Sequence, residues 1–183
     1  LQDDEEKLRK RYLDILTNEE LATRFKLRSK FWNVIRQYLL EKDFIEVETP
    51  VLENTTGGAD ARPFATHHNA LDIDVYLRIS AGELWQKRLM VAGLPRTFEI
   101  GRIFRNEGMS NEHAQDYTQL EYYMAYSDYR IGMEMTKELY RKIAREVFGK
   151  TTFSIRGFEV DFESEWEIYT FCGLIKKHFS IDP

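Results

Sequence analysis

Residues 98–126 constrain the fold most, because they predict two alternating strands joined by a polar loop. Up to residue 105, successive side chains of the first strand point to opposite faces, as in any extended chain. The loop, residues 106–115, contains Gly108 for a turn and a single histidine, His113. The return strand, residues 117–126, has a mostly apolar face and a polar, aromatic face that carries Tyr117, Gln119, Glu121 and Tyr123. The sequence therefore predicts a hairpin with one face unsuited to a dry core.

The polar face of this hairpin suits a small ligand that carries a cationic group and a flat ring. Glu121 stands between two tyrosines on that face, and an unpaired carboxylate is costly to bury. Arg105, at the end of the first strand, offers a planar fork of donors that fits phosphate oxygens, and Glu107 follows it. The same pattern also fits a surface hairpin with scattered ion pairs, because runs of charge are usually solvated. The residues alone leave both interpretations open.

Several sequence blocks, in order, resemble the class II aminoacyl-tRNA synthetases. FRNEG at residues 104–108, then His113, then YTQLE at residues 117–121 resemble motif 2 of that family, which spans about residues 98–126 here. The resemblance is narrowed to the lysyl-tRNA synthetases by GGADARPF at residues 57–64, THHNALDIDVYLRI at 66–79 and ELWQKRL at 83–89. It extends from about residue 11 to residue 183. It implies an α+β fold, with a largely antiparallel sheet flanked by helices.

Composition limits the classes of function. At 183 residues the chain is long enough for one domain with a core, and a net charge of −5 gives no overall basic field for nucleic acid. The single cysteine, Cys172, excludes an internal disulfide and cysteine-rich zinc sites, and its apolar helical surroundings predict a core position. No run of residues approaches the eighteen apolar residues of a membrane span, so a cytoplasmic location is the expectation.

The charged residues at the N-terminus predict a lead-in, residues 1–17. The family resemblance implies that residues 18–183 form a partial catalytic domain. Thr17 and Glu20 have the spacing of a capping box, so a helix should begin there and continue to about residue 42. Its apolar arc is wide enough either for deep burial or for contact with a partner subunit. A short strand, residues 43–52, contains Pro50, which suits a strand end. Residues 27–52 resemble motif 1, which implies a homodimer.

The remaining elements alternate between strands and helices. We expect a strand at residues 72–79, a helix at 83–93 with Leu84, Leu89, Val91 and Ala92 inward, a helix at 128–148 capped by Asp128, a hairpin at 153–162 around Arg156-Gly157, and a last helix from Ser164 to about His178. The apolar stripe of the helix at 128–148, which runs from Ile131 to Val147, predicts core positions. Two glycines, Gly57 and Gly58, predict a turn or a close approach of the backbone to a ligand. His67 and His68 point to opposite faces of an extended chain, so no metal site is predicted.

The resemblance implies a reaction in two steps. The lysine carboxylate attacks the α-phosphate of ATP to give lysyl-adenylate and pyrophosphate, and the aminoacyl group then passes to tRNA(Lys). Matched residue by residue, the ATP-binding residues are Arg105, which also acts as the catalytic residue on the α-phosphate, Glu107 on the adenine amino group, His113 on the distal phosphates and Tyr117 on the adenine ring. The lysine-binding residues are Gly58, Glu83, Glu121 and Tyr123. Gln119 stands where an apolar residue is common in the family, and its role is open.

Two carboxylates in the predicted pocket suit a substrate with two ammonium groups. An aspartate pocket would instead need a cation facing the substrate side chain. The turn formed by Ser80, Ala81 and Gly82 is one residue longer than the family's usual turn before Glu83.

Some parts of the family pattern have no counterpart in these residues. A third motif with an ATP-clamping arginine, the acidic residues that hold Mg²⁺, and an anticodon-binding OB-fold have no match, so we expect a partial domain that is inactive alone. Three other functions stay open: a class II paralogue that lysylates a protein, an aspartate or asparagine enzyme, and a non-catalytic interaction module.

Overall fold

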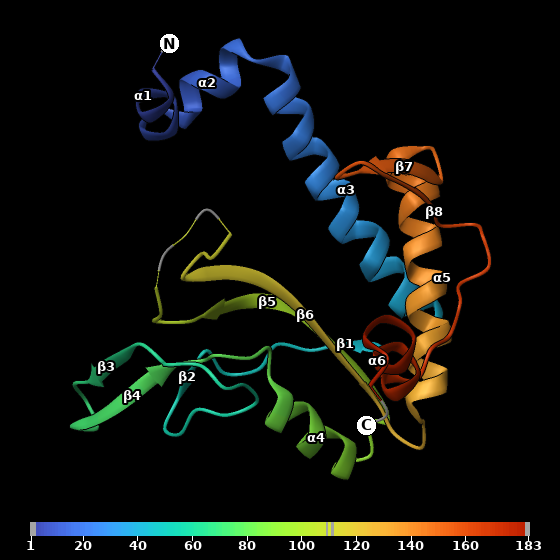
Figure 1. The fold of residues 1–183 in the computed structure, drawn as a ribbon. Coiled ribbons are helices and arrows are strands. Elements are labelled where there is room, and N and C mark those ends of the chain that lie inside the picture. Colours follow the sequence, from blue (N-terminus) through green and yellow to red (C-terminus); the bar gives the residue numbers. More distant parts are fainter. Residues whose placement is uncertain (1–2, 109, 111, 182–183) are drawn as a thin grey trace. The chain divides into compact units, whose positions relative to one another are not determined.

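The computed structural model describes residues 3–108, 110 and 112–181, and contacts divide the chain into two compact units. One unit is Ile35–Met135, and the other combines the two ends of the chain, up to Val34 and from Thr136. The helices are α1 (Asp4–Arg9), α2 (Arg11–Thr17), α3 (Glu19–Glu41), α4 (Glu83–Val91), α5 (Tyr129–Phe148) and α6 (Phe171–Phe179) (Figure 1). The strands are β1 (Ile45–Glu46), β2 (Leu52–Glu53), β3 (Ala65–His68), β4 (Ile73–Leu77), β5 (Arg96–Phe104), β6 (Asp116–Met124), β7 (Thr152–Ile155) and β8 (Phe158–Asp161).

The predicted hairpin is the centre of the unit Ile35–Met135. Strands β5 and β6 pair antiparallel over nine residues each, with Glu99 opposite Glu121 and Gly101 opposite Gln119. Strand β1 pairs parallel with β5 on its other side, so the sheet order is β1-β5-β6 (Figure 1). The predicted α+β class, with antiparallel strands flanked by helices, is confirmed.

Residues 43–52 do not form the single strand that the sequence predicts. They form β1 and β2, which belong to different sheets, since β2 pairs with β4 in a sheet of order β2-β4-β3. The connection between them contains Thr49, whose backbone N–H donates to the Glu99 carboxylate at 3.2 Å, and Pro50, which has no N–H. A continuous ladder is therefore impossible here, and the segment joins the two sheets.

The core of this unit lies between the end of α3 and the β1-β5-β6 sheet. Leu39 and Phe98 are fully buried, and Phe44 packs edge-on against Tyr122 with ring centroids 5.9 Å apart. The Tyr38 hydroxyl donates to the backbone oxygen of Met135 at 2.9 Å, which satisfies a polar group inside the apolar contact. Helix α4 packs against β5 and β6. Within the described residues no helix, including the 23-residue α3, is long and apolar enough to cross a membrane.

The other unit is held by aromatic packing around the predicted hairpin at residues 153–162, which is confirmed as β7 and β8. Its turn, Arg156-Gly157, has φ of 52° and 86°, the left-handed values that a two-residue hairpin turn needs. Phe162 lies within 6.2 Å, centroid to centroid, of three other rings, those of Tyr140, Phe153 and Trp166. The Arg141 guanidinium donates to the backbone oxygen of Phe162 at 2.8 Å and fixes the chain beyond β8.

Helix ends differ from the predictions where a second capping residue competes. Helix α3 is capped by Asn18, whose side-chain oxygen accepts from Leu21 N at 3.1 Å, whereas the Thr17 hydroxyl donates to Leu13 O at the end of α2. The last helix does not begin after Ser164. It begins at Phe171, capped by Thr170, and Ser164 instead caps the end of the hairpin by donating to Asp161 O at 2.7 Å.

Burial is wrongly predicted in three helices. Cys172 is exposed, and α6 contains no buried residue at all over Phe171–Phe179 despite its apolar side chains. In and just after α4, Leu84 is 47% exposed, Val91 is 91% exposed and Ala92 is exposed too, and the buried residue is Gln86, whose amide is satisfied by hydrogen bonds. Ile131, the first residue of the predicted stripe in α5, is 42% exposed, whereas Met135, Leu139 and Val147 are buried as predicted. Periodicity indicates which side of a helix is apolar, but it does not show which residues on that side are covered by other elements.

Gly82, the N-terminal cap of α4, provides a test of this fold. Its φ is 77°, and a Cβ there would collide with the Thr49 hydroxyl and lie 3.0 Å from Glu99 Oε2. We expect Gly82→Ala to lower the free energy of unfolding in urea by at least about 1 kcal/mol, because both strain and crowding oppose a side chain. Gly132→Ala in α5 is the control, because an added Cβ there would have no neighbour within 4 Å. This change should be neutral or stabilising by about 0.5–1 kcal/mol. Equal effects of the two changes would contradict the geometry of this turn.

Candidate active site

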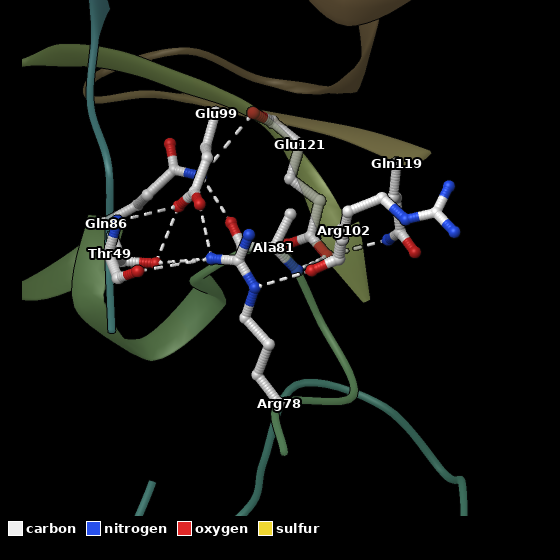
Figure 2. A network of polar contacts seen from close by, with 8 residues as sticks. All are labelled: Thr49, Arg78, Ala81, Gln86, Glu99, Arg102, Gln119 and Glu121. Carbon is white, nitrogen blue, oxygen red and sulfur yellow. Dashed lines mark hydrogen bonds and ion pairs between the residues drawn. The ribbon is translucent and has the colours of Figure 1, made fainter. Parts of the chain in front are cut away.

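A buried ion pair forms the base of the site. Arg78, just after β4, and Glu99, in β5, are each 3% exposed, and the Arg78 guanidinium donates to Glu99 Oε1. The other carboxylate oxygen of Glu99 accepts from the Thr49 hydroxyl at 2.6 Å, and Arg78 Nε donates to Arg102 O at 2.8 Å (Figure 2). Buried charges persist where they are paired and fully hydrogen-bonded, as both are here. The pair joins the segment before β2, the end of β4 and the middle of β5.

Glu121 lies opposite Glu99 on the same face of the hairpin, but its partners are all neutral. Its Oε1 accepts from Ala81 N at 2.8 Å and from the Gln119 amide at 2.7 Å, and its Oε2 accepts from the Tyr123 hydroxyl at 2.9 Å. Among the described residues it forms no ion pair, although it is only half-buried. Glu121 is therefore an oriented carboxylate to which the described residues bring no cation.

The turn before α4 is fixed by the buried Gln86. Its amide donates to Ala81 O at 2.9 Å, and its carbonyl accepts from the Thr97 hydroxyl of β5 at 2.9 Å. These bonds hold the turn of Ser80, Ala81 and Gly82, with Gly82 in the left-handed conformation, so that Ala81 N points at Glu121 (Figure 2).

Gly58, Glu83 and Tyr123 are linked to Glu121 by a series of contacts. Gly58 has φ of 86°, and a Cβ there would collide with the Ser80 hydroxyl and lie 2.9 Å from Glu83 Cβ, so this backbone approaches Glu83 closely. Glu83 forms a 2.6 Å ion pair with Lys87, whose ammonium lies 5.8 Å from the centre of the Tyr123 ring. Burial, with the Glu121 hydrogen bond and the charges of Glu121 and Glu83, raises the pKa of the Tyr123 phenol well above its ordinary value, so the phenol remains a donor. The structure thus brings the four predicted lysine-binding residues together.

Arg105 and Tyr117 lie side by side at the open end of the hairpin. The Arg105 guanidinium is 5.9 Å from the centre of the Tyr117 ring, and its backbone N–H donates to Gln115 O at 2.7 Å. In the described part of the chain, two buried side-chain polar atoms have no hydrogen-bond partner: Arg105 Nε and Glu53 Oε2, which lies in a separate hollow beside Trp85 and Arg88. A buried donor without an acceptor is uncommon, so Arg105 is the polar side chain of this hairpin whose hydrogen bonding the described residues leave incomplete.

Glu107 lines a hollow of about 560 Å³ with Asp60, Arg62 and Asn106. Its carboxylate accepts from Arg62 N at 3.3 Å, and Asn106 N donates to Arg62 O at 2.7 Å. These contacts attach the residues after β5 to the segment that follows Gly58, so that the hollow has two walls from distant parts of the sequence.

His113 is not brought to these residues. It is exposed in the loop, where its Nδ1 lies 2.6 Å from the Ser110 hydroxyl. Within the described residues, no hydrogen bond, ion pair or ring contact joins it to Arg105, Glu107 or Tyr117.

The described residues contain no group of three or more histidine, cysteine, aspartate or glutamate side chains that could hold a metal ion. His67 pairs with two exposed carboxylates, Asp74 at 3.2 Å and Asp72 at 3.3 Å, and His68 accepts from Leu71 N within its own turn.

Sequence reasoning missed the residues that support the site rather than line it. Arg78 occurs in the apolar segment VYLRI, where a charged residue is the signal, whereas Gln86 lies among the charged residues of ELWQKRL, which gives no signal of its burial. Ala81 contributes a backbone N–H, which no side-chain pattern reveals.

Comparison with known proteins gives this geometry its class. The family model described as tRNA synthetases class II (D, K and N) matches residues 3–183, so the chain belongs to this family. Its relatives include the lysine–tRNA ligase of Actinobacillus pleuropneumoniae serotype 7 (strain AP76), 51% identical over 178 residues, and that of Escherichia coli (strain K12), 48% identical over 178 residues. Each alignment covers 97% of this chain and 35% of the relative, so the chain spans about a third of the length of the curated relatives it matches.

The buried ion pair is tested by comparison with a surface pair of the same unit. Arg78→Met leaves the Glu99 carboxylate buried without a cation, so we expect the free energy of unfolding to fall by about 3–5 kcal/mol. Arg36→Met removes the half-exposed pair with Glu46, 2.8 Å long, and should cost about 1 kcal/mol or less. Urea unfolding of both variants measures the difference, and a loss for Arg78→Met no larger than for Arg36→Met would show that Arg78 does not hold the base of the site.

Proposed function

We propose that this chain is part of a lysine–tRNA ligase, which joins lysine to ATP as lysyl-adenylate, releases pyrophosphate, and transfers the lysyl group to the terminal adenosine of tRNA(Lys). The observation that supports this proposal best is Glu121, an oriented and half-buried carboxylate without a cation among the described residues, bonded to Tyr123, whose phenol also lies near the charge of Glu83. The relatives named as lysine–tRNA ligases support the same substrate.

The amino-acid pocket of this proposal is built from Glu83, Glu121, Tyr123 and Gly58. Lysine carries two ammonium groups at neutral pH: one can donate to Glu121, and the other can donate to Glu83, whose carboxylate it then shares with Lys87. The Tyr123 ring offers a face for a cation, as its contact with Lys87 illustrates. An aspartate substrate would add a third negative charge to the two carboxylates of this pocket, which would repel it.

The nucleotide site of the proposal is built around Arg105. Its guanidinium binds the α-phosphate and stabilises the charge that develops when the lysine carboxylate attacks and pyrophosphate leaves, and the unpaired Nε supports this role. Tyr117 stacks on the adenine ring, and Glu107, an acceptor-only carboxylate, accepts from the adenine amino group in the hollow that it lines. His113 binds the distal phosphates, which requires its loop to approach the nucleotide. These residues position the reactants and neutralise charge, and none forms a covalent intermediate.

Mg²⁺ accompanies ATP in the family, but the described residues offer no cluster of ligands for it. We therefore assign no Mg²⁺ ligand in this chain, and the roles proposed for Arg105 and Glu121 do not depend on one.

A homodimer is part of the proposal, formed through the segment of residues 27–52. Apolar side chains are exposed along it, with Ile45 45%, Val51 41% and Leu52 49% exposed, and burying such a row on a second copy would be favourable. The reaction belongs in the cytoplasm, where lysine, ATP and tRNA occur together.

The proposed reaction is tested by amino-acid-dependent exchange of pyrophosphate into ATP, catalysed by the full-length protein. Lysine should support exchange, whereas aspartate and asparagine should not. Exchange with aspartate or asparagine in place of lysine would contradict the assignment of the pocket.

Arg105→Ala tests the nucleotide site in the same assay. We expect the rate of lysine-dependent exchange to fall by about 10²–10³-fold, because a positioned donor to the developing charge is lost, while the thermal unfolding midpoint stays near that of the wild type. Arg102→Ala is the matched control, since its side chain pairs with Asp116 and is exposed on the other face of the strand. Exchange by Arg105→Ala at the level of Arg102→Ala would mean that Arg105 does not act on the phosphate.

A further inference from the structure

We infer that Gln119 is a positioning residue for substrate: its amide orients the Glu121 carboxylate and directs the substrate ammonium to one of the two oxygens. The inference rests on the proposed function, because it assumes that Glu121 binds an ammonium group. It assigns a role to the residue of the polar face whose function the sequence leaves open.

Gln119 lies on the polar face of β6, close to Glu121. Alternation along β6 places it on the same face as Tyr117 and Glu121, between the proposed nucleotide and amino-acid sites. Its cross-strand partner is Gly101, where a Cβ would collide with the Arg78 guanidinium. The missing side chain leaves room for Arg78, and Gln119 extends along its own strand to Glu121, with Nε2 2.7 Å from Oε1 (Figure 2).

The two carboxylates on this face, Glu99 and Glu121, differ in the charge of their partners. Glu99 and Glu121 are directly opposite each other, and like charges at paired positions repel. Glu99 is neutralised by Arg78, whereas the described part of the chain gives Glu121 only neutral donors, from Ala81, Gln119 and Tyr123. A neutral amide stabilises the carboxylate by donating to it and leaves its charge for the substrate. A lysine or arginine at position 119 would instead form an ion pair with Glu121 and neutralise the charge that binds the substrate.

The two oxygens of the Glu121 carboxylate accept different numbers of hydrogen bonds. A carboxylate oxygen accepts about two hydrogen bonds. Oε1 already accepts two, from Ala81 N and from Gln119, whereas Oε2 accepts one, from Tyr123. The ammonium of the substrate therefore has one open position, on Oε2, next to the Tyr123 ring. Without Gln119, Oε1 regains an open position, and the carboxylate can rotate away from the geometry that faces the substrate.

Two substitutions separate this role from simple space filling. Gln119→Met keeps the length of the side chain without a donor, and Gln119→Glu keeps its shape but places a second carboxyl against Glu121. In lysine-dependent pyrophosphate exchange by the full-length protein, we expect Gln119→Met to raise KM for lysine about tenfold, because a hydrogen bond to a charged group is lost. KM for ATP should change by less than about twofold, since ATP does not contact Glu121. Gln119→Glu should raise KM for lysine further than Gln119→Met.

The control is Thr118→Val, which removes a polar group from the same strand on the opposite face and should leave both KM values unchanged. An unchanged KM for lysine in Gln119→Met, a parallel rise in both KM values, or a smaller effect of the isosteric Gln119→Glu would each overturn the inference. Failure of the proposed function is distinguishable, because the wild-type protein would then show no lysine-dependent exchange at all.

Discussion

The ion pair between Arg78 and Glu99 is the interaction on which the rest of the site depends. It is almost completely buried, and its hydrogen bonds reach Thr49 before β2 and the backbone of Arg102 in β5. These segments are far apart in sequence and belong to two different sheets. Since a buried charge is costly without its partner, the pair fixes how the two sheets of this unit meet. Glu121 and Tyr123 lie on β6, the strand that pairs with the one carrying Glu99.

Space for this pair is provided by residues that have little or no side chain. Gly101 leaves room for the guanidinium, and Gly82 leaves room for Thr49 and the Glu99 carboxylate. The turn at Gly82 then presents Ala81 N to Glu121, so the buried pair and the half-buried Glu121 carboxylate belong to one continuous set of polar contacts (Figure 2). A site assembled in this way is preorganised, because its donors are in place before any ligand arrives.

The hairpin and its two faces could be predicted from the sequence, because alternation in an extended chain determines which side chains share a face. The cluster of Gly58, Glu83, Glu121 and Tyr123 could be predicted only through family resemblance, since nothing local relates the turn at Gly58 to β6. The break of the chain at Thr49 and the burial of Gln86 could not be predicted, because both depend on hydrogen bonds to residues distant in sequence. Cys172 shows the opposite error, an apolar pattern that stays exposed.

We propose that the unit Ile35–Met135 contains a nucleotide site and, beside it, an amino-acid site that selects a substrate with two positive charges. The most direct test is a thermal-shift titration of the protein with non-hydrolysable analogues of lysyl-adenylate and aspartyl-adenylate. A ligand that binds only the folded state raises the unfolding midpoint in proportion to RT ln(1 + [L]/Kd), so modest affinity is measurable at high concentration. We expect a concentration-dependent rise of the midpoint with the lysyl analogue and none with the aspartyl analogue. An equal rise with both, or a rise with the aspartyl analogue alone, would contradict it.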